Sequence, residues 1–296
     1  MKIGYPCINR SLECSSGRTF RLASYSDERL ITTVAGNLTC LKRILEWNCE
    51  NKIRFFRITS DIIPFASHPV CTFPWKIHFH DELEGIGHFI RESGMRISMH
   101  PDQFIILNSP DEKVVSRSID ELMYHAELLD GMNLDRTAKI QLHVGGVYGE
   151  AEQSIARFIR TYKSLDPSVQ NRLVVENDDQ RFTAADCLKI HEETGIPILF
   201  DVFHHTCKNS GEDTGEMLKM TGKTWSQSDG IPMTDYSSQH PEKRAGSHTE
   251  HIDPDDFRNF LRVSSPFDID IMLEIKDKEK SAIEAVAIAG SDPRFS

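Results

Sequence analysis

Histidines and carboxylates recur at the ends of apolar runs along this chain. Most of them close such a run, and the others follow in the next connection: His100, His143, Glu176, Asp201, His204, Asp235, His248 and Glu274. Imidazole and carboxylate groups together suit Zn²⁺, Mn²⁺ or Fe²⁺, whereas Ca²⁺ prefers oxygen ligands. The residue types therefore indicate a transition-metal centre.

The size of this set bears on how many ions it holds. Buried carboxylates at such a density repel one another and would have to take up protons unless cations neutralise them. The set exceeds the four ligands that one zinc ion commonly takes, so it predicts a cluster of two or three divalent ions. Taken singly, each residue has an ordinary alternative, such as a hydrogen-bonded core histidine for His143 or a helix cap for Glu176. Their joint placement is what favours metal binding.

Short β-rich runs bring these residues to the ends of predicted strands. The runs are Lys2–Cys7, Ile53–Thr59, Arg96–His100, Lys139–Val144, Arg172–Glu176, Pro197–Val202, Ile231–Tyr236 and Asp268–Ile275. Their content of Ile, Val, Leu and Phe is typical of buried parallel strands. The segments between them have the spacing of amphipathic helices. We expect Ser26 to cap the first helix, and Thr183 and Gly195 to begin and end the one after the fifth run.

Eight strand–helix units predict an α/β fold, a (β/α)₈ TIM barrel, in which the carboxyl ends of all strands meet at one mouth. An open doubly wound sheet is the alternative, but the turn after the first run lacks the Gly-x-Gly of such folds. No linker interrupts the pattern, so residues 1–296 are expected to form a single domain with the barrel proper spanning about 2–290. The long connections are expected to carry function: residues 9–25, 60–80 and 205–230.

Two pairs of residues in the connections suit a nucleic acid. Gln103 and Phe104 follow the His-Pro turn of the third run, and an amide beside an exposed aromatic ring can hydrogen-bond a base edge and replace a stacked base. Tyr5 and Asn9 offer a second pair of this kind. The ordinary alternatives are packing at the barrel rim for Phe104 and turn chemistry for the second pair.

Catalytic roles are expected for two carboxylates and one lysine. Lys276 stands two residues past Glu274, on the same face if the strand continues to that point. From there its ammonium could stabilise charge on a phosphate in the transition state. We therefore expect Glu176, Glu274 and Lys276 to carry the catalytic work.

Composition limits the class of protein. The 296 residues are 39% hydrophobic and 27% charged, as in globular proteins. No apolar run approaches the roughly 20 residues of a membrane span, and residues 1–5 do not read as a signal peptide. We expect a cytoplasmic protein with no membrane contact and no obligate protein partner. The seven cysteines form no Cys-x-x-Cys pair, which disfavours disulfides and thiolate zinc sites. The net charge of −11 argues against nucleic acid binding unless bound cations offset it.

Taken together, the motifs resemble those of the UV damage endonuclease family. The matching segments, in order over about residues 2–280, are Gly4-Tyr5 with Asn9, Ser98–Gln103, Leu142-His143, Val175–Asp178, Phe200–His205, Tyr236–Gln239, Gly246–His248 and Met272–Glu279. The resemblance implies a barrel enzyme with a cluster of divalent metals, commonly Mn²⁺, with Zn²⁺ and Mg²⁺ as alternatives. It implies that damaged double-stranded DNA is nicked immediately 5′ of cyclobutane pyrimidine dimers and 6-4 photoproducts. Metal-activated water would attack the phosphodiester and leave a 3′ hydroxyl.

The resemblance also assigns the residues that would touch DNA. It implies that Gln103 and Phe104 wedge into the duplex at the lesion, and that Tyr5 and Asn9 probe the opposite strand. Phe104 stands where a Tyr is frequent in the family. Stacking would therefore be retained at this position, while the hydroxyl is lost.

One metal site departs from the family pattern. Some members carry a carbamate-forming Lys and a His on the seventh strand, where this chain has Met233 and Asp235. Asp235 can still bind a metal, but Met233 cannot become a carbamate. The departure leaves the detail of this site open.

Other functions fit the same cluster of ligands. An abasic-site endonuclease of the trinuclear-metal barrel type would share the chemistry and differ in substrate. A metal-dependent sugar isomerase on a similar barrel would need no wedging pair at Gln103 and Phe104. A non-catalytic metal-binding protein is the remaining alternative.

Overall fold

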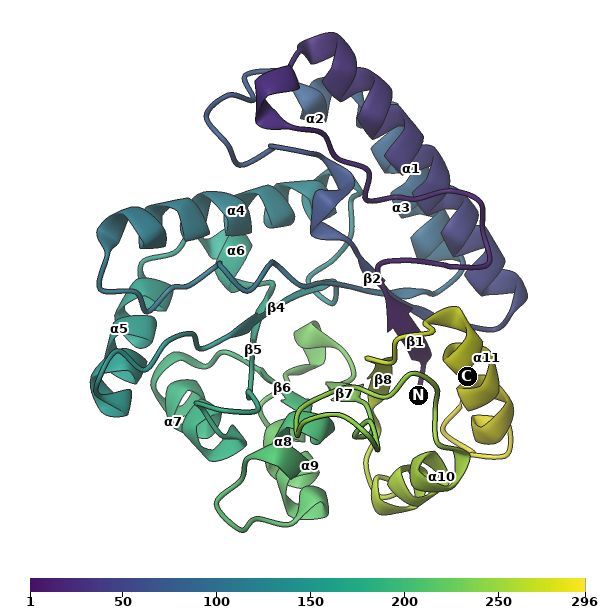
Figure 1. Cartoon of the computed structure of the whole chain (residues 1–296), viewed down its shortest axis with the longest axis vertical. Helices are drawn as coiled ribbons and strands as arrows, with labels where there is room; N and C mark the ends of the chain where they lie inside the picture. The colour runs from purple at the N-terminus through teal and green to yellow at the C-terminus, as the bar shows by residue number, and fades with distance from the viewer. Residues whose placement is uncertain (296) are drawn as a thin grey trace.

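Eight parallel strands close into a barrel in the computed structural model, which describes residues 1–295 (Figure 1). They are β1 (Ile3–Pro6), β2 (Phe55–Ile58), β3 (Arg96–Met99), β4 (Lys139–His143), β5 (Leu173–Glu176), β6 (Ile198–Asp201), β7 (Met233–Tyr236) and β8 (Asp270–Leu273). Each strand pairs with the next along the chain, and β8 returns to pair with β1. The predicted (β/α)₈ barrel is confirmed, because each predicted run contains one of these strands.

The longer helices surround the ring of strands (Figure 1). The helices are α1 (Asp27–Glu50), α2 (Trp75–His78), α3 (His80–Glu92), α4 (Glu112–Gly131), α5 (Ala151–Lys163), α6 (Pro167–Gln170), α7 (Ala184–Thr194), α8 (Val202–Cys207), α9 (Thr214–Gly222), α10 (Pro254–Val263) and α11 (Glu279–Ala289), with short 3₁₀ turns at Leu22–Ser24, Ser60–Ile62 and Gln227–Asp229. The predicted caps are confirmed. The Ser26 hydroxyl accepts from the Arg29 N–H, Thr183 caps α7 through the Asp186 N–H, and Gly195 ends that helix at φ 73°. No helix among the described residues combines the length and apolar character needed to cross a membrane.

Alternate residues of each strand point into the barrel and fill it in layers. The amino-terminal end holds charged pairs, among them Lys139 Nζ with Asp229 Oδ1 at 2.6 Å. The next layer is apolar and consists of Phe55, Val174, Leu199, Met233 and Met272. The layer at the carboxyl end carries the predicted metal ligands. The apolar layer therefore separates two sets of buried charges inside one barrel.

The remaining strand residues face outward and pack against the helices. Ile3 and Tyr5 of β1 and Phe56 of β2 belong to this main hydrophobic core, together with Leu41 and Ile44 of α1. The core therefore lies between the strand ring and the helices. It holds the strands in place while leaving the inward-facing residues free to be polar at the carboxyl end.

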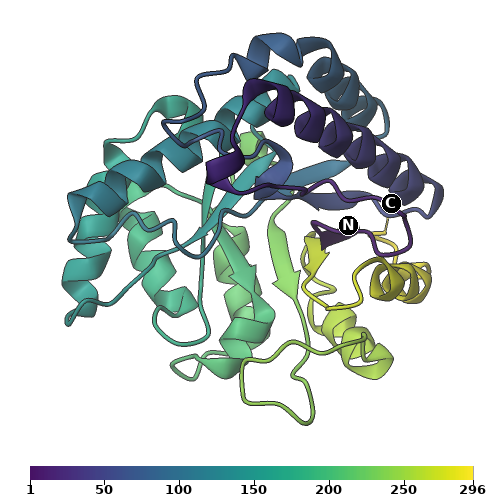
Figure 2. The ribbon, with the colours of Figure 1, turned by 45° about the horizontal axis from the view of Figure 1, so that its top comes forward.

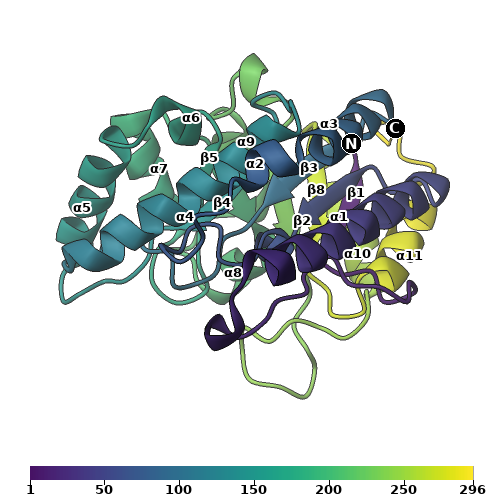
Figure 3. The same ribbon diagram turned by 90° about the horizontal axis from the view of Figure 1, so that it is seen from above.

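The connections that follow the strands gather at one end of the barrel. Figure 3 shows the β1–α1 connection (purple) and the β7–α10 connection (light green) on the same side, and Figure 2 shows the latter projecting beyond the strands. Residues 205–230, predicted to be a long loop, contain α9. A disulfide joins Cys14 in the β1–α1 connection to Cys40 of α1. The expectation that the cysteines form no disulfide is wrong for this pair, because only the fold brings together two cysteines that lie 26 residues apart.

Candidate metal centre and DNA-facing mouth

The register of neighbouring strands places predicted ligands side by side. His143 of β4 is the pairing partner of Glu176 of β5, and Asp201 of β6 is that of Asp235 of β7. Glu274 follows β8 directly. Because parallel strands end at the same mouth of the barrel, these residues from distant parts of the chain meet there.

The ligand atoms gather into three overlapping groups, and within each group the atoms lie within 4.8 Å of one another. The first group is His100, His143 and Glu176; the second is Glu176, Asp201 and His204; the third is Asp201, Asp235 and Glu274. Glu176 and Asp201 each belong to two groups, so each of these carboxylates would contribute to two of the candidate sites. The structure thus brings together all the predicted ligands except His248.

His248 lies beside the third group without belonging to it. Its Nε2 is 3.9 Å from Glu274 Oε2, and its Nδ1 is 2.8 Å from the backbone carbonyl oxygen of Glu274. The residue sits in the β7–α10 connection, in an isolated antiparallel bridge with Gln239. The backbone contact orients the imidazole, as commonly happens for histidines that bind metals.

Several buried atoms of the centre lack a hydrogen-bond partner among residues 1–295. They are Glu176 Oε1, Asp201 Oδ2, Asp235 Oδ1 and His143 Nδ1. An unpartnered charged oxygen is costly to bury in the absence of a cation. Each of the three groups contains at least one of these atoms. The mixed nitrogen and oxygen donors, with lone pairs left free, therefore fit divalent ions such as Mn²⁺ or Zn²⁺.

The protonation of the centre follows from burial and from its close charges. Burial lowers the pKa of His100 to about 4, so this imidazole is neutral at pH 7 and can bind a cation. Burial opposes the charging of His204 as well, but Asp201 and Glu176 outweigh it and raise the pKa of His204 to about 11. Burial and the neighbouring carboxylates raise the pKa of Asp201 to about 7, against the influence of His204. In the absence of ions, His204 therefore supplies positive charge to the second group.

Two inward-facing strand residues that the sequence analysis missed complete the centre. Arg57 of β2 is buried and pairs with Asp235, at 2.6 Å from Nη2 to Oδ2, and with Glu274. Gln141 Nε2 of β4 donates to Glu176 Oε2 and Asp235 Oδ2, each at 2.8 Å. A lone charge within the apolar strand that holds Arg57 was the signal that could have found it, since unpaired charges are rarely buried.

Gln103 and Phe104 lie in the β3–α4 connection next to the centre. The Phe104 side chain is 73% exposed. A cavity of about 470 Å³ is lined by both residues and also by His100, His143 and His204. Phe104 also lines a second cavity, of about 790 Å³. The ring therefore borders two cavities, one of which reaches three of the predicted metal ligands.

Tyr5 and Asn9 do not reach the surface. Tyr5 lies on the outward face of β1, where its ring is buried against Phe56 with the centroids 5.3 Å apart. Its hydroxyl donates to Asn48 Oδ1 of α1 at 2.6 Å and accepts from Asn9 Nδ2 at 2.8 Å. The expected contact of this pair with the opposite DNA strand is thus not supported by their placement. The strand alternation points Tyr5 toward α1, and the two side chains instead brace the β1–α1 connection.

Lys276 does not share a strand face with Glu274, so the placement on which its expected catalytic role was based is not found. Strand β8 ends at Leu273, so the two-residue alternation no longer holds at position 276. Lys276 Nζ is bound by Glu250 Oε1 at 2.8 Å. Burial lowers the pKa of the neighbouring Lys278, and the charges of Cys7 and Glu274 oppose that shift.

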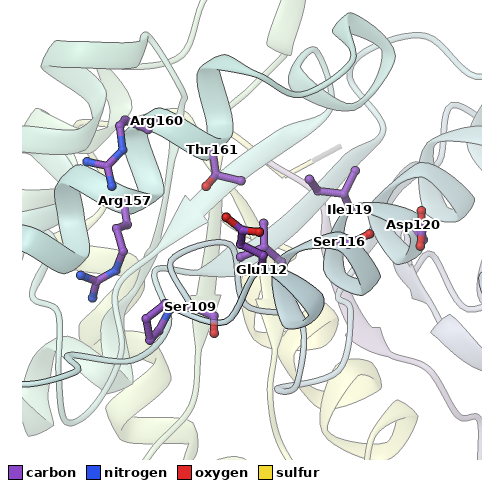
Figure 4. A pocket seen from close by; sticks show the side chains of 10 residues that line it. Ser109, Glu112, Ser116, Ile119, Asp120, Arg157, Arg160 and Thr161 are labelled. Atoms are coloured by element: carbon purple, nitrogen blue, oxygen red, sulfur yellow. The ribbon is translucent and has the colours of Figure 1, made fainter.

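A third cavity, of about 480 Å³, lies between α4 and α5 (Figure 4). Arg157 and Arg160 of α5 line one side, Ile119 and Asp120 of α4 line the other, and Glu112 projects between them. None of the predicted metal or DNA residues lines this cavity. It therefore takes no part in the arrangement at the barrel mouth.

The fold and the mouth define a (β/α)₈ barrel with a candidate centre for several metal ions. The sequence profile of the family described as UV-endonuclease UvdE matches residues 1–291. The chain belongs to this family of UV-damage endonucleases, as the motifs predicted.

Individual relatives agree with this assignment. The chain is 39% identical over 288 residues to the UV DNA damage endonuclease of Clostridium perfringens, covering 97% of this chain and 70% of that protein. It is 31% identical over 296 residues to that of Bacillus thuringiensis, covering 97% and 93%. The crystal structure of SacUVDE superposes with a TM-score of 0.94 at 46% identity over 98% of both chains. A D-tagatose 3-epimerase-like protein, at 12% identity and a TM-score of 0.60, shares the fold alone.

Proposed function

We propose that this protein is a metal-dependent DNA repair endonuclease that nicks duplex DNA immediately 5′ of UV photoproducts and leaves a 3′ hydroxyl. Its substrates are duplexes with cyclobutane pyrimidine dimers or 6-4 photoproducts. The observation that carries the proposal is the cavity of about 470 Å³ that Phe104 shares with three imidazoles of the centre. A ring able to enter a duplex and groups able to hold ions at a phosphate thus lie at one site. Membership in a family of UV-damage endonucleases supports this assignment.

The centre fits two or three divalent ions, with Mn²⁺ as the first candidate and Zn²⁺ or Mg²⁺ as alternatives. The residues that would hold them are His100, His143, Glu176, Asp201, His204, Asp235, His248 and Glu274. Ions bound there would supply an activated water and neutralise the oxygens of the phosphodiester. These ions also account for how a chain with a net charge of −11 can accept DNA at this mouth.

The side chains of the protein position the reaction. Gln141 holds one oxygen of Glu176 at 2.8 Å and leaves the other free to bind cations. Arg57 fixes Glu274 from within the barrel. At the lesion, Phe104 takes the place of a displaced base, and Gln103 hydrogen-bonds base edges. A damaged step is the cheapest to open, because its stacking and pairing are already weakened.

A nicking assay tests the proposal directly. The substrate is an end-labelled duplex with one thymine dimer, incubated with Mn²⁺ or with EDTA. We expect a single cut 5′ of the dimer that requires the metal and is lost in Glu176→Gln. Glu112→Gln, which alters an acid in the cavity between α4 and α5, is the matched control and should cut normally. An abasic-site duplex in competition measures substrate preference.

Two results would contradict the proposal. The first is the absence of any dimer-dependent cut with Mn²⁺, Zn²⁺ or Mg²⁺. The second is equal cutting of damaged and undamaged duplexes, which would leave Phe104 and its cavity without a role in recognition.

A further inference from the structure

The three ligand groups differ in the protein groups that already face their carboxylates. In the first and second groups, the carboxylates face imidazole nitrogens at 3.3 to 3.9 Å. In the third group, a permanent cation is in direct contact with two of the three ligands. Arg57 pairs with Asp235 at 2.6 Å and with Glu274 through its other terminal nitrogen. This group also contains no histidine.

Arg57 cannot leave these carboxylates by losing its proton, because guanidinium stays charged in proteins. Its side chain is buried at 2% exposure. Although burial opposes its charge, Asp235 and Glu274 raise the pKa of Arg57 above the ordinary arginine value. Gln141 adds a second donor to Asp235 Oδ2, at 2.8 Å. Of the two carboxylate oxygens of Asp235, Oδ2 thus has two donors, whereas Oδ1 has no hydrogen-bond partner among residues 1–295.

We propose that Arg57 takes the place of a third metal ion in this protein. The centre then holds two divalent ions, in the first and second groups, and a fixed guanidinium in the third. The inference rests on the proposed function and deepens it, since it sets the number of ions. Unlike an ion, the guanidinium does not exchange with solvent, so one positive charge stays beside Asp235 and Glu274 whether or not metal is present.

Counting the charges also favours two ions in the first and second groups and none in the third. The four carboxylates of the three groups carry four negative charges when ionised, and Arg57 cancels one of them. Two divalent ions bring four positive charges against the remaining three. Three ions would bring six into a buried mouth that already contains a guanidinium. An ion on the free oxygen of Asp235 would lie close to that guanidinium, and like charges repel strongly at short range where water is excluded.

The seventh strand offers the third group nothing further. Met233 lies in the apolar layer with Phe55, Leu199 and Met272, so it supplies no ligand from that position. Asp235 is therefore the strand's only contribution to the groups, and it is also the carboxylate that Arg57 and Gln141 both engage. The weakest of the three candidate sites is thus the one beside Arg57.

Metal counting on the full chain tests this inference. The protein is stripped with EDTA, titrated with Mn²⁺ by calorimetry, and analysed for retained manganese after desalting. We expect two Mn²⁺ per chain for the wild type. Arg57→Gln removes the charge and keeps an amide donor, and it should retain a third ion. Arg57→Lys restores the charge and should return the count to two.

Arg96→Gln is the matched control. Arg96 is also a buried arginine that faces an aspartate, Asp270 at 3.7 Å, but it lies at the amino-terminal end of the barrel. This variant should bind two ions like the wild type. A third ion in the Arg96 variant would show that loss of any buried arginine loosens the centre, and would overturn the inference.

The wild-type protein alone can also decide the matter if Arg57→Gln does not fold. Crystals grown with Mn²⁺ should show two anomalous peaks, near Glu176, and none between Asp235 and Glu274. Three results would overturn the inference: a peak between those two carboxylates, three Mn²⁺ of comparable affinity in the wild type, or an unchanged ion count in a folded Arg57→Gln. None of them would contradict the proposed endonuclease activity. A wild type that binds no metal removes both.

Discussion

Truncating Phe104 should separate lesion binding from fold stability. The side chain is 73% exposed, so about a quarter of its surface is buried in the fold. Full burial of a Phe side chain is worth about 3 kcal/mol at most, so Phe104→Ala should cost less than about 1 kcal/mol of unfolding free energy. Removing an aromatic ring that stacks on a base costs about 1–3 kcal/mol of binding. We therefore expect the Kd for a thymine-dimer duplex to rise roughly 5- to 150-fold.

The assay is fluorescence anisotropy with Mn²⁺ of a labelled duplex whose scissile phosphate is replaced by an uncleavable analogue, together with thermal unfolding of each variant. Ile77→Ala is the matched control, because Ile77 on α2 is 80% exposed and lines none of the three cavities described above. Phe104→Trp should retain most of the affinity, since it keeps a stacking ring. A Kd for Phe104→Ala within twofold of the wild type would refute the reasoning. So would an equal loss of affinity in Ile77→Ala.

Two further predictions concern the lysines. Lys276→Ala should leave single-turnover nicking within about twofold of the wild type, because Glu250 already binds its ammonium; a loss of a hundredfold or more would restore its catalytic role. Lys139→Met should cost about 1.5–3 kcal/mol in urea unfolding, because it removes the 2.6 Å partner of buried Asp229 while Arg136, at 3.4 Å, remains. Burial lowers the pKa of Lys139 to about 8, so the folded protein releases this proton before the unfolded chain does. Between about pH 8 and 10.4, the unfolding free energy of the wild type should therefore rise with pH relative to that of Lys139→Met. Parallel pH profiles of the two proteins would contradict this linkage.

The barrel was predictable from the sequence because its strands leave a repeated local signal. Most of the strands are short apolar runs that end at or beside a histidine or a carboxylate, and the parallel arrangement brings those ends to one mouth. His143, Glu176 and Asp201 could therefore be assigned to a common site before any coordinates were known. The ends of the strands were less predictable. Strand β8 stops at Leu273, so the expected shared face of Lys276 and Glu274, which required the strand to continue, is not formed.

The residues of the site that could not be predicted from the sequence depend on contacts across the barrel. Arg57 and Gln141 neutralise and orient carboxylates from strands that are distant in sequence, and no local pattern names their partners. The buried position of Tyr5 could nevertheless have been predicted from the sequence. Strand alternation puts its side chain on the helix-facing side of β1, where the Asn48 amide oxygen accepts a hydrogen bond from the Tyr5 hydroxyl. The disulfide of Cys14 depends on the folded path of the β1–α1 connection and left no spacing signal.

The proposed ion count also explains how DNA can approach an acidic protein. When the imidazoles are counted as neutral, as metal binding requires, Arg57 and the four carboxylates of the centre leave three negative charges at the mouth, where a phosphate has to bind. Two divalent ions change that local balance to one positive charge, while the formal charge of the chain only moves from −11 to −7. Charges beyond about 10 Å are largely screened at physiological salt, so the local sign governs the approach of the phosphate. A net negative protein can therefore present a cationic mouth, provided that the centre is loaded before the DNA arrives.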